Sequence, residues 1–247
     1  VVIGTRAARG AVGHADAFAA LRGPRAGVFV GTSGERVVLR HMGAIAYASR
    51  GPDGAMTPGS FARAFAARVP VEHLERTLPQ YLTARLAGLF GAEGPSGTVQ
   101  TACTSSAQAI SEALRLIRRG EIDVAVAGGA ECIVSPIEMQ LFCLLGVMSK
   151  HNEAPEAASR PFDARRDGFV MGEGAGFLVL EEREHARARG ARILAELAGY
   201  GTACDAYRIT DEAPDGRGAI RAMQAAVADA GLALDEVDYV NAHGTST

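Results

Sequence analysis

Cys103 is the residue of this chain best placed to do chemistry. It lies in the run Thr101–Ala107, between a short β-branched segment, Gly97–Thr101, and a stretch in which apolar residues recur with helical spacing. Arg118 precedes Gly120, where that helix is expected to end. Cys103 is therefore expected at a helix N-terminus, where free N–H groups and the helix dipole favour a thiolate over a thiol. A thiolate in that position is a nucleophile.

The predicted helix places Ala107, Ile110, Leu114 and Ile117 on one face, which would pack against a sheet. A free cysteine is also a common core residue, because it behaves as a small hydrophobic side chain. The position of Cys103 alone therefore leaves a nucleophilic and a structural role equally open.

His243 lies at the end of the second segment with chemical potential. An apolar strand in Val237–Thr247 is expected to run into a small, hydroxyl-rich turn that begins at His243. A histidine at such a strand end is accessible, and a distant cysteine and histidine can meet in the folded chain. This pairing favours the nucleophilic interpretation of Cys103.

Four sequence blocks extend this pattern. They are Gly94–Ser106, Asp123–Glu131, Ser159–Gly176 and Asn241–Thr247. With these blocks in this order, the chain resembles a β-ketoacyl synthase, a condensing enzyme of fatty-acid and polyketide assembly in the thiolase superfamily. The resemblance covers most of the chain from about Gly27 onward.

The resemblance implies a role for each candidate site residue. Cys103 would take an acyl group from the phosphopantetheine arm of acyl carrier protein. His243 would donate a hydrogen bond to a malonyl thioester oxygen as carbon dioxide leaves and the enolate forms. Thr245 and Thr247 match hydroxyls that contact the pantetheine arm. The implied reaction needs no metal and no cofactor besides the carrier arm of its substrates.

Two alternatives remain beside a condensing enzyme. The chain could be a non-catalytic subunit resembling a chain-length factor, although such subunits usually replace the nucleophile that Cys103 retains. It could also be a thiolase-like acyltransferase with the same nucleophile and a different acceptor.

The end of the chain departs from the family pattern. Ketosynthases of this type carry a second catalytic histidine, a supporting lysine and a gating loop after the turn that begins at His243, whereas this sequence stops at Thr247. We therefore expect a truncated enzyme, one chain of a split enzyme, or a degenerate subunit. Such a chain is expected to accept an acyl group on Cys103 but not to complete condensation efficiently alone. A homodimer, or a heterodimer with another ketosynthase chain, is also expected.

Composition excludes several classes of protein. A chain of 247 residues with 48% hydrophobic content can build a sizeable core. Its net charge of −3 gives no electrostatic case for nucleic-acid binding, and no apolar run is long enough to cross a membrane. The four cysteines show neither a Cys-x-x-Cys pair nor zinc-site spacing. Reduced thiols and a cytoplasmic location are expected.

Strands and helices alternate along the chain, which predicts an α/β fold with mainly parallel sheets. The resemblance refines this to the thiolase-like layered fold, here the N-terminal half and the start of the C-terminal half. We expect a boundary near Gly190, so that residues 1–189 carry the nucleophile and residues 190–247 carry the first catalytic histidine.

The expected elements are as follows. The strands are Val1–Arg6, Gly27–Gly31, Gly97–Thr101, Asp123–Ala127, Gly174–Leu180, Ala191–Gly199 and Asp238–Asn241. The helices are Ser60–Arg68, Pro79–Phe90, the segment after Cys103, Pro136–Leu145, Glu181–Arg189 and Ala219–Ala230.

Three further expectations concern the middle of the chain. The apolar segment Ile137–Leu145 is expected in the core rather than along an acyl tunnel. The glycines of Gly172–Gly176 run into a strand and do not have phosphate-loop spacing, so no nucleotide site is expected there. Structural charge pairs are expected for four residues. These are Asp163, Arg166, Asp167 and Glu173.

Overall fold

The structure is a computed structural model that describes residues 1–35, 41–208 and 211–247. The chain divides into two compact units, one formed by Val1–Arg192 with Thr245–Thr247 and the other by Ile193–Gly244. The expected assignment of the nucleophile to residues 1–189 and of the catalytic histidine to residues 190–247 stays a prediction.

The first unit is built on a four-stranded sheet with the order β2-β1-β3-β4. Its strands are β1 (Ala26–Gly31), β2 (Ser96–Val99), β3 (Val124–Cys132) and β4 (Glu173–Glu181). Strand β1 pairs in parallel with β2 and β3, whereas β4 is antiparallel to β3. The four strands predicted in these regions are confirmed with shifted ends. The sheet is mixed because β4 reverses direction.

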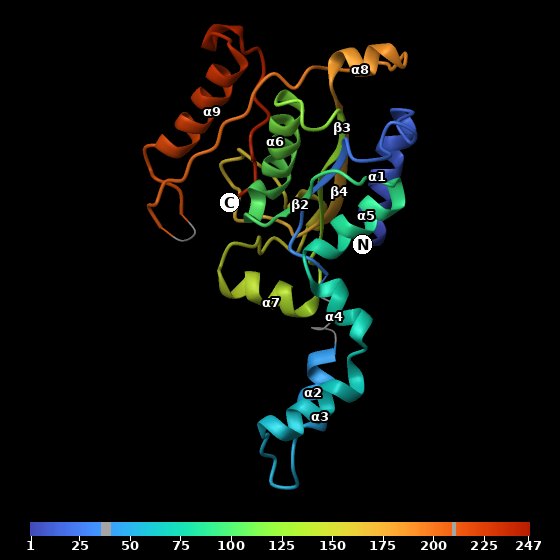
Figure 1. The fold of residues 1–247 in the computed structure, drawn as a ribbon. Coiled ribbons are helices and arrows are strands. Elements are labelled where there is room, and N and C mark those ends of the chain that lie inside the picture. The colour runs from blue at the N-terminus through green and yellow to red at the C-terminus, as the bar shows by residue number, and fades with distance from the viewer. Residues whose placement is uncertain (36–40, 209–210) are drawn as a thin grey trace. The chain divides into compact units, whose positions relative to one another are not determined.

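Helices cover both faces of this sheet and give the unit three layers (Figure 1). Helices α1 (Val2–His14) and α5 (Gln80–Phe90) pack on one face, and α6 (Ser105–Arg118) packs on the other. The central strand β1 is buried along its whole length, because its side chains alternate between the two helical layers. Val28 lies in the core under α1 and α5, and Phe29 lies in the core under α6.

Helix α6 packs on the sheet with most of the predicted face: Leu114 is buried, and Ile110 and Ile117 pack against the buried cluster. Ala109 and Ala113 are fully buried and pack with Ala125 and Ala127 of β3, whereas Ala107 is exposed. The small side chains allow the helix to lie close to the sheet, and the larger apolar residues flank the contact. The prediction was wrong for Ala107, and it missed Ala109 and Ala113 because the spacing rule weights large side chains over alanine.

The N-terminal segment is helical, so the expected strand at Val1–Arg6 is wrong. Gly4, Ala8 and Val12 are the buried residues of α1 and recur every four positions, which is helical spacing. The β-branched start of the segment favoured a strand, but the burial of one helical stripe decides the structure.

The remaining helices of the first unit are short. Among them are α2 (Met42–Ala48), α3 (Pro58–Arg68), α4 (Val71–Thr77), α7 (Pro136–Leu144), α8 (Arg183–Ala188) and the 3₁₀ helix Pro155–Ala157. Helices α2 and α3 pack together around Ile45, Ala64 and Val69. Helix α3 begins before the expected start at Ser60, because Thr57 is its N-cap: Thr57 accepts from the Ser60 N–H, and Ser60 closes the capping box.

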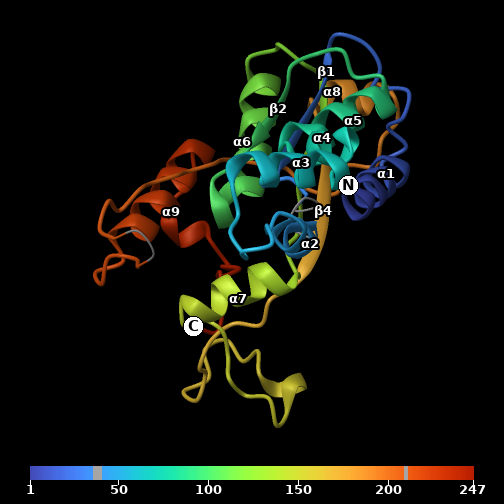
Figure 2. The ribbon, with the colours of Figure 1, turned by 90° about the horizontal axis from the view of Figure 1, so that it is seen from below.

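Helix α7 contradicts the expectation that Ile137–Leu145 belongs to the core. Leu141, Leu144 and Leu145 are 55%, 77% and 60% exposed. The helix begins at a Ser135 cap and leads into the long loop that precedes β4, which Figure 2 shows from below. A helix that is apolar on all sides needs a covering surface, and the described residues of this chain leave its leucines open.

The second unit contains α9 (Arg217–Ala230) and the 3₁₀ helix Leu234–Glu236. The expected strands at residues 191–199 and 238–241 are wrong, since neither segment is a strand in the structure. A strand needs a hydrogen-bonded neighbour, and the sequence pattern does not supply one. Gly199 and Gly201 instead lie so close to the backbone of α9 that a Cβ would clash with it.

Within residues 1–35, 41–208 and 211–247, no helix combines the length and the apolar character needed to cross a membrane.

Candidate active site

Cys103 lies in a short turn between a strand and a helix. Strand β2 ends at Val99, the 3₁₀ helix Ala102–Thr104 follows, and α6 begins at Ser105. The Cys103 side chain is exposed. The predicted position at the start of a helix is therefore correct, and the alternative of a buried structural cysteine does not fit this exposure.

Hydroxyl groups hold the turn around Cys103 in place. The Thr101 N–H donates to Ser105 Oγ at 2.8 Å, and Ser105 Oγ donates to the Ala102 carbonyl at 2.7 Å. Thr104 Oγ1 donates to the Thr101 carbonyl at 2.9 Å. Ser105 is buried, so its hydroxyl replaces water for the backbone groups that the tight turn leaves unpaired.

The backbone at Ala102 is strained. Its φ angle is +52°, in the left-handed region that residues with a Cβ rarely occupy. Such strain persists where surrounding contacts fix the backbone, and it is frequent at functional sites. The next residue, Cys103, is exposed and lies just before the first turn of α6.

Two glycines allow this turn to approach the sheet. A Cβ on Gly31 would clash with the backbone of Ser105 and Ser106, and a Cβ on Gly129 would clash with Ser106 Oγ. Gly31 ends β1, and Gly129 lies beside it in β3. The first turn of α6 is therefore seated on a part of the sheet that has no side chains.

The C-terminal turn holds the other candidate residues. Thr245 Oγ1 and Thr247 Oγ1 are 2.6 Å apart, so the structure brings the two predicted pantetheine-contacting hydroxyls together. Ser246 between them is 3% exposed and has a φ angle of +72°. Thr245 and Thr247 belong to the same unit as Cys103, whereas His243 belongs to the other unit. The meeting of Cys103 with His243 stays a prediction.

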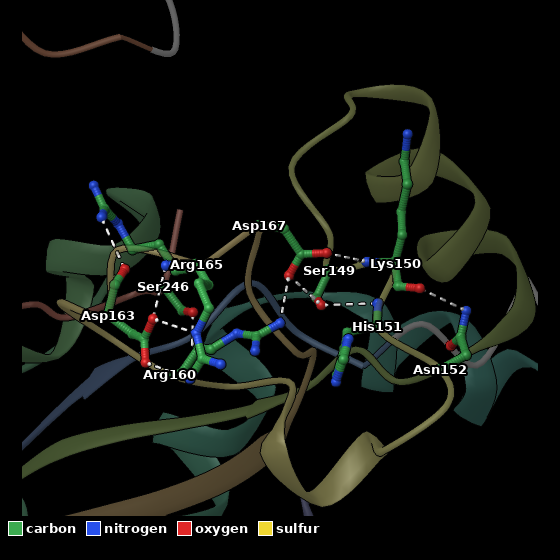
Figure 3. A network of polar contacts seen from close by, with 10 residues as sticks. Ser149, Lys150, His151, Asn152, Arg160, Asp163, Arg165, Asp167 and Ser246 are labelled. Atoms are coloured by element: carbon green, nitrogen blue, oxygen red, sulfur yellow. Dashed lines mark hydrogen bonds and ion pairs between the residues drawn. The ribbon is translucent and has the colours of Figure 1, made fainter.

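A polar network fixes the loop beside the C-terminal turn (Figure 3). Asp167 accepts hydrogen bonds from Ser149 Oγ at 2.7 Å and from the Lys150 N–H at 3.0 Å, and it forms an ion pair with Arg160 at 3.7 Å. The Ser149 hydroxyl, followed by the Lys150 N–H, lowers the pKa of the Asp167 carboxyl below its ordinary value. The Arg160 N–H donates to Ser246 Oγ at 3.0 Å, which joins the network to the turn.

The charge pairs expected in this region are confirmed in part. Asp163 pairs with Arg165, and Asp167 pairs with Arg160. Arg166 instead donates to the carbonyl of Thr247, and Glu173 accepts from the Cys132 thiol at 2.9 Å. The expected charge pair is therefore wrong for Arg166 and Glu173, which bond to a backbone group and to a thiol instead.

Three residues of the site were not predicted from the sequence: Ala102, Ser105 and Ser246. The hydroxyl-rich composition of Thr104–Ser106 was a usable signal for the Ser105 contacts, because serine and threonine bond to nearby backbone groups. The contact between Ser246 and Arg160 spans 86 positions in the chain, and no local pattern indicates it.

Comparisons with known proteins show which sequences and folds this chain resembles. Residues 2–186 match the family model described as beta-ketoacyl synthase, N-terminal domain, and residues 194–247 match the model of the C-terminal domain. The chain is 50% identical over 181 residues to 3-oxoacyl-[acyl-carrier-protein] synthase 2 of Rhizobium meliloti (strain 1021). That alignment covers 70% of this chain and 43% of the relative, so the chain spans less than half of that protein's length.

Solved structures show the same fold. One is a type II polyketide synthase acyl carrier protein in complex with its ketosynthase bound to the hexaketide, with a TM-score of 0.85 and 31% identity. The match covers 100% of this chain and 59% of that one. Another is the ishigamide ketosynthase/chain length factor, with a TM-score of 0.76 and 35% identity. That match covers 98% of this chain and 57% of the other chain. These similarities confirm the predicted thiolase-like α/β fold class.

Proposed function

The chain belongs to the β-ketoacyl synthase family, and we propose that it acts in decarboxylative Claisen condensation on acyl carrier protein thioesters, in fatty-acid or polyketide biosynthesis. The observation that carries this proposal is the exposed Cys103 thiol at the start of α6, held in a strained and hydroxyl-bonded turn. An accessible thiol at a helix N-terminus is the arrangement that nucleophilic acyl transfer requires.

In the first step, the Cys103 thiolate attacks the carbonyl carbon of an acyl thioester. The resulting oxyanion needs backbone N–H donors, and the N–H of Cys103 is the expected donor on this chain. The bond between the acyl carbon and the pantetheine sulfur then breaks, and the carrier thiolate leaves and takes up a proton. The acyl group is now bound to Cys103 as a new thioester.

In the second step, a malonyl thioester loses carbon dioxide and forms an enolate. The enolate carbon attacks the carbonyl of acyl-Cys103, the carbon–sulfur bond to Cys103 breaks, and a 3-oxoacyl thioester remains on the carrier. His243 would donate a hydrogen bond to the malonyl thioester oxygen, where negative charge develops. Neither step calls for a metal, nicotinamide or nucleotide cofactor.

The pantetheine arm is the proposed ligand of Thr245 and Thr247. The arm carries amide groups, and the hydroxyls of the two threonines stand 2.6 Å apart on one turn. Hydroxyls can both donate to and accept from amides, so this pair suits a polar arm that enters an otherwise apolar site. Acyl carrier protein is accordingly the proposed substrate-bearing partner, in a cytoplasm that keeps Cys103 reduced.

A second copy of this chain is the proposed assembly partner, with a related ketosynthase chain as the alternative. In the four-stranded sheet β2 is an edge strand, so its outer side offers backbone groups for pairing. Helix α7 exposes three leucines that a second subunit would cover. A solved relative is itself described as a ketosynthase with a chain length factor, which supports pairing of related chains in this family.

Intact-protein mass spectrometry tests the proposed nucleophile. The purified chain is incubated with hexanoyl-acyl carrier protein, and we expect one hexanoyl group on the wild type and none on the Cys103→Ala variant. Cys143→Ala is the matched control, because Cys143 is also exposed and lies outside the proposed site. Acylation of Cys103→Ala to the same extent as the wild type would overturn the assignment.

Release of carbon dioxide separates condensation from simple acyl transfer. The acylated chain is mixed with malonyl-acyl carrier protein carrying a ¹³C-labelled carboxyl group. Formation of labelled carbon dioxide together with a 3-oxoacyl product supports the condensing function, and efficient turnover would contradict the expectation that this chain does not complete condensation alone. Acylation followed by transfer to another acceptor without carbon dioxide release favours the thiolase-like acyltransferase. A chain that is not acylated at all fits the chain-length-factor alternative.

A further inference from the structure

The segment Arg160–Gly168 holds the C-terminal turn by three hydrogen bonds. The Arg160 N–H donates to Ser246 Oγ at 3.0 Å, and the Gly168 N–H donates to the Ser246 carbonyl at 3.0 Å. Arg166 Nε donates to the Thr247 carbonyl at 2.9 Å. The turn is therefore fixed at two consecutive residues by a segment about eighty positions away in sequence.

Ser246 is buried and has an unfavourable backbone conformation. It is 3% exposed, and its φ of +72° lies in the left-handed region. A serine in that conformation costs about 1 to 2 kcal/mol relative to ordinary backbone. Because both its hydroxyl and its carbonyl are bonded to the same segment, the unfavourable conformation is held in place.

The holding segment makes further polar contacts of its own, and Figure 3 draws those of Asp163 and Asp167. Arg166 Nη1 donates to the Asp163 carbonyl at 3.1 Å, and Asp163 Oδ1 accepts from the Arg165 N–H at 2.7 Å. Asp167 is bonded to Ser149 and to the Lys150 N–H on the other side of the loop. Arg166 thus bridges a fixed loop and the end of the turn with one guanidinium group.

We propose that Arg166 and Ser246 are positioning residues, which set the hydroxyls of Thr245 and Thr247 to receive the pantetheine arm of the acyl donor. This inference rests on the proposed function. Neither residue needs to touch the reacting atoms. Their effect passes through the turn, because the two threonines flank Ser246 and the Thr247 carbonyl is the group that Arg166 holds.

Arg165 offers a matched control. It is adjacent to Arg166 and carries the same charge, but its guanidinium pairs with the Asp163 carboxylate and is 80% exposed. A substitution at Arg165 therefore removes one positive charge from the same loop and leaves the bond to Thr247 intact.

The test compares two acyl donors that deliver the same acyl group to Cys103. Hexanoyl-pantetheine carries the arm, whereas S-phenyl thiohexanoate lacks it. For Arg166→Ala we expect the half-saturating concentration of hexanoyl-pantetheine to rise about tenfold, with a maximal acylation rate within about twofold of wild type. The acylation rate of Arg166→Ala with S-phenyl thiohexanoate should stay within about twofold of wild type. Arg165→Ala should change the acylation kinetics with neither donor.

A second variant tests the turn from its other contact. Ser246→Ala removes the acceptor of the Arg160 N–H and should shift the preference between the donors in the same direction. Arg166→Lys, which can still donate to the Thr247 carbonyl, should restore part of the affinity for hexanoyl-pantetheine.

The outcomes separate the inference from the function beneath it. If Arg166→Ala slows both donors equally, or changes neither, the positioning role is overturned while acylation of Cys103 stands. If the wild-type chain is acylated by neither donor, the proposed function itself fails. Selective loss with the arm-bearing donor supports the inference.

Discussion

Ala102 has a strained backbone conformation directly before the exposed Cys103. Its φ of +52° costs about 1 to 2 kcal/mol for a residue with a Cβ. Ser105 and Thr104 offset this cost with hydrogen bonds to the main chain on both sides of the strained residue. The conformation of Ala102 therefore lowers the stability of the fold, and the hydroxyl side chains of Thr104 and Ser105 hold the turn in that conformation.

Ala102→Gly should therefore stabilise the chain. Glycine adopts positive φ without strain, and its greater freedom in the unfolded chain removes part of the gain, so we expect an increase of up to about 1 kcal/mol in the free energy of unfolding. Urea unfolding measures this change. The control is Ala107→Gly, at an exposed position within α6, which should lose about 1 kcal/mol. Destabilisation by both substitutions would contradict the strained geometry at Ala102.

The pairing of α6 with the sheet is the feature that seats the proposed nucleophile. The first turn of α6 lies where β1 and β3 both present glycine, so the backbone of the helix contacts the strands directly. This contact fixes how far the Cys103 turn stands from the sheet. A single added methyl group there has no space to occupy.

Gly31→Ala tests this contact. The new Cβ would press on the backbone of Ser105 and Ser106, and overpacking of this kind costs about 1 to 3 kcal/mol. We expect a lower free energy of unfolding and slower acylation of Cys103, since the turn must move. Gly176→Ala in β4 is the control, because a Cβ there meets no atom within 4 Å. If both variants behave like wild type in urea unfolding and in acylation, the close contact does not exist.

The loop before β4 should be sensitive to acid through Asp167. The Ser149 hydroxyl and then the Lys150 N–H lower the pKa of this carboxyl, so the charged form stabilises the fold. That contribution is fully present above the ordinary value of 3.8 and is lost as the pH falls through the lowered pKa. Asp167→Asn should therefore be less stable than wild type at neutral pH, and the difference should shrink in acid.

Urea unfolding at a series of pH values from neutral to strongly acidic measures this effect. Glu153→Gln, an exposed carboxylate in the same loop, controls for the change in net charge. A stability difference between wild type and Asp167→Asn that is constant with pH would rule out the ionised carboxylate as its source.

At the scale of the whole molecule, secondary structure could be predicted from the sequence wherever the residues of one segment determine its structure. The strand–turn–helix around Cys103 followed from β-branched residues, helical spacing and a terminal glycine, all within about twenty-five positions. The buried strands β1 and β3 were equally clear, because continuous apolar runs between glycines are typical of buried parallel strands.

Strands, burial and hydrogen bonds could not be predicted from the sequence wherever they depend on a residue or surface far away in the chain. Residues 191–199 have a strand-like composition, but a strand exists only with a hydrogen-bonded neighbour. The apolar pattern of α7 predicted burial, but it does not say which surface covers the helix. In the candidate site, the role of Ser246 could not be predicted, because its hydrogen-bond partners Arg160 and Gly168 lie in a different part of the chain.

The exposed leucines of α7 give the last prediction, which concerns assembly. If a second copy covers this helix, the wild-type chain should form dimers, and Leu144→Asp should weaken them. Burying a leucine contributes about 1.5 to 3 kcal/mol, so the dimer dissociation constant should rise by at least about tenfold.

Size-exclusion chromatography with light scattering, over a dilution series, measures the dissociation constant of each variant. Leu234→Asp is the control, since Leu234 is also exposed, at 63%, but lies in the second unit. Equal weakening by both substitutions would indicate a general effect of lost hydrophobicity. A wild-type chain that stays monomeric at every concentration would contradict the proposed dimer. Leu144, which is 77% exposed, would then have no second subunit to cover it.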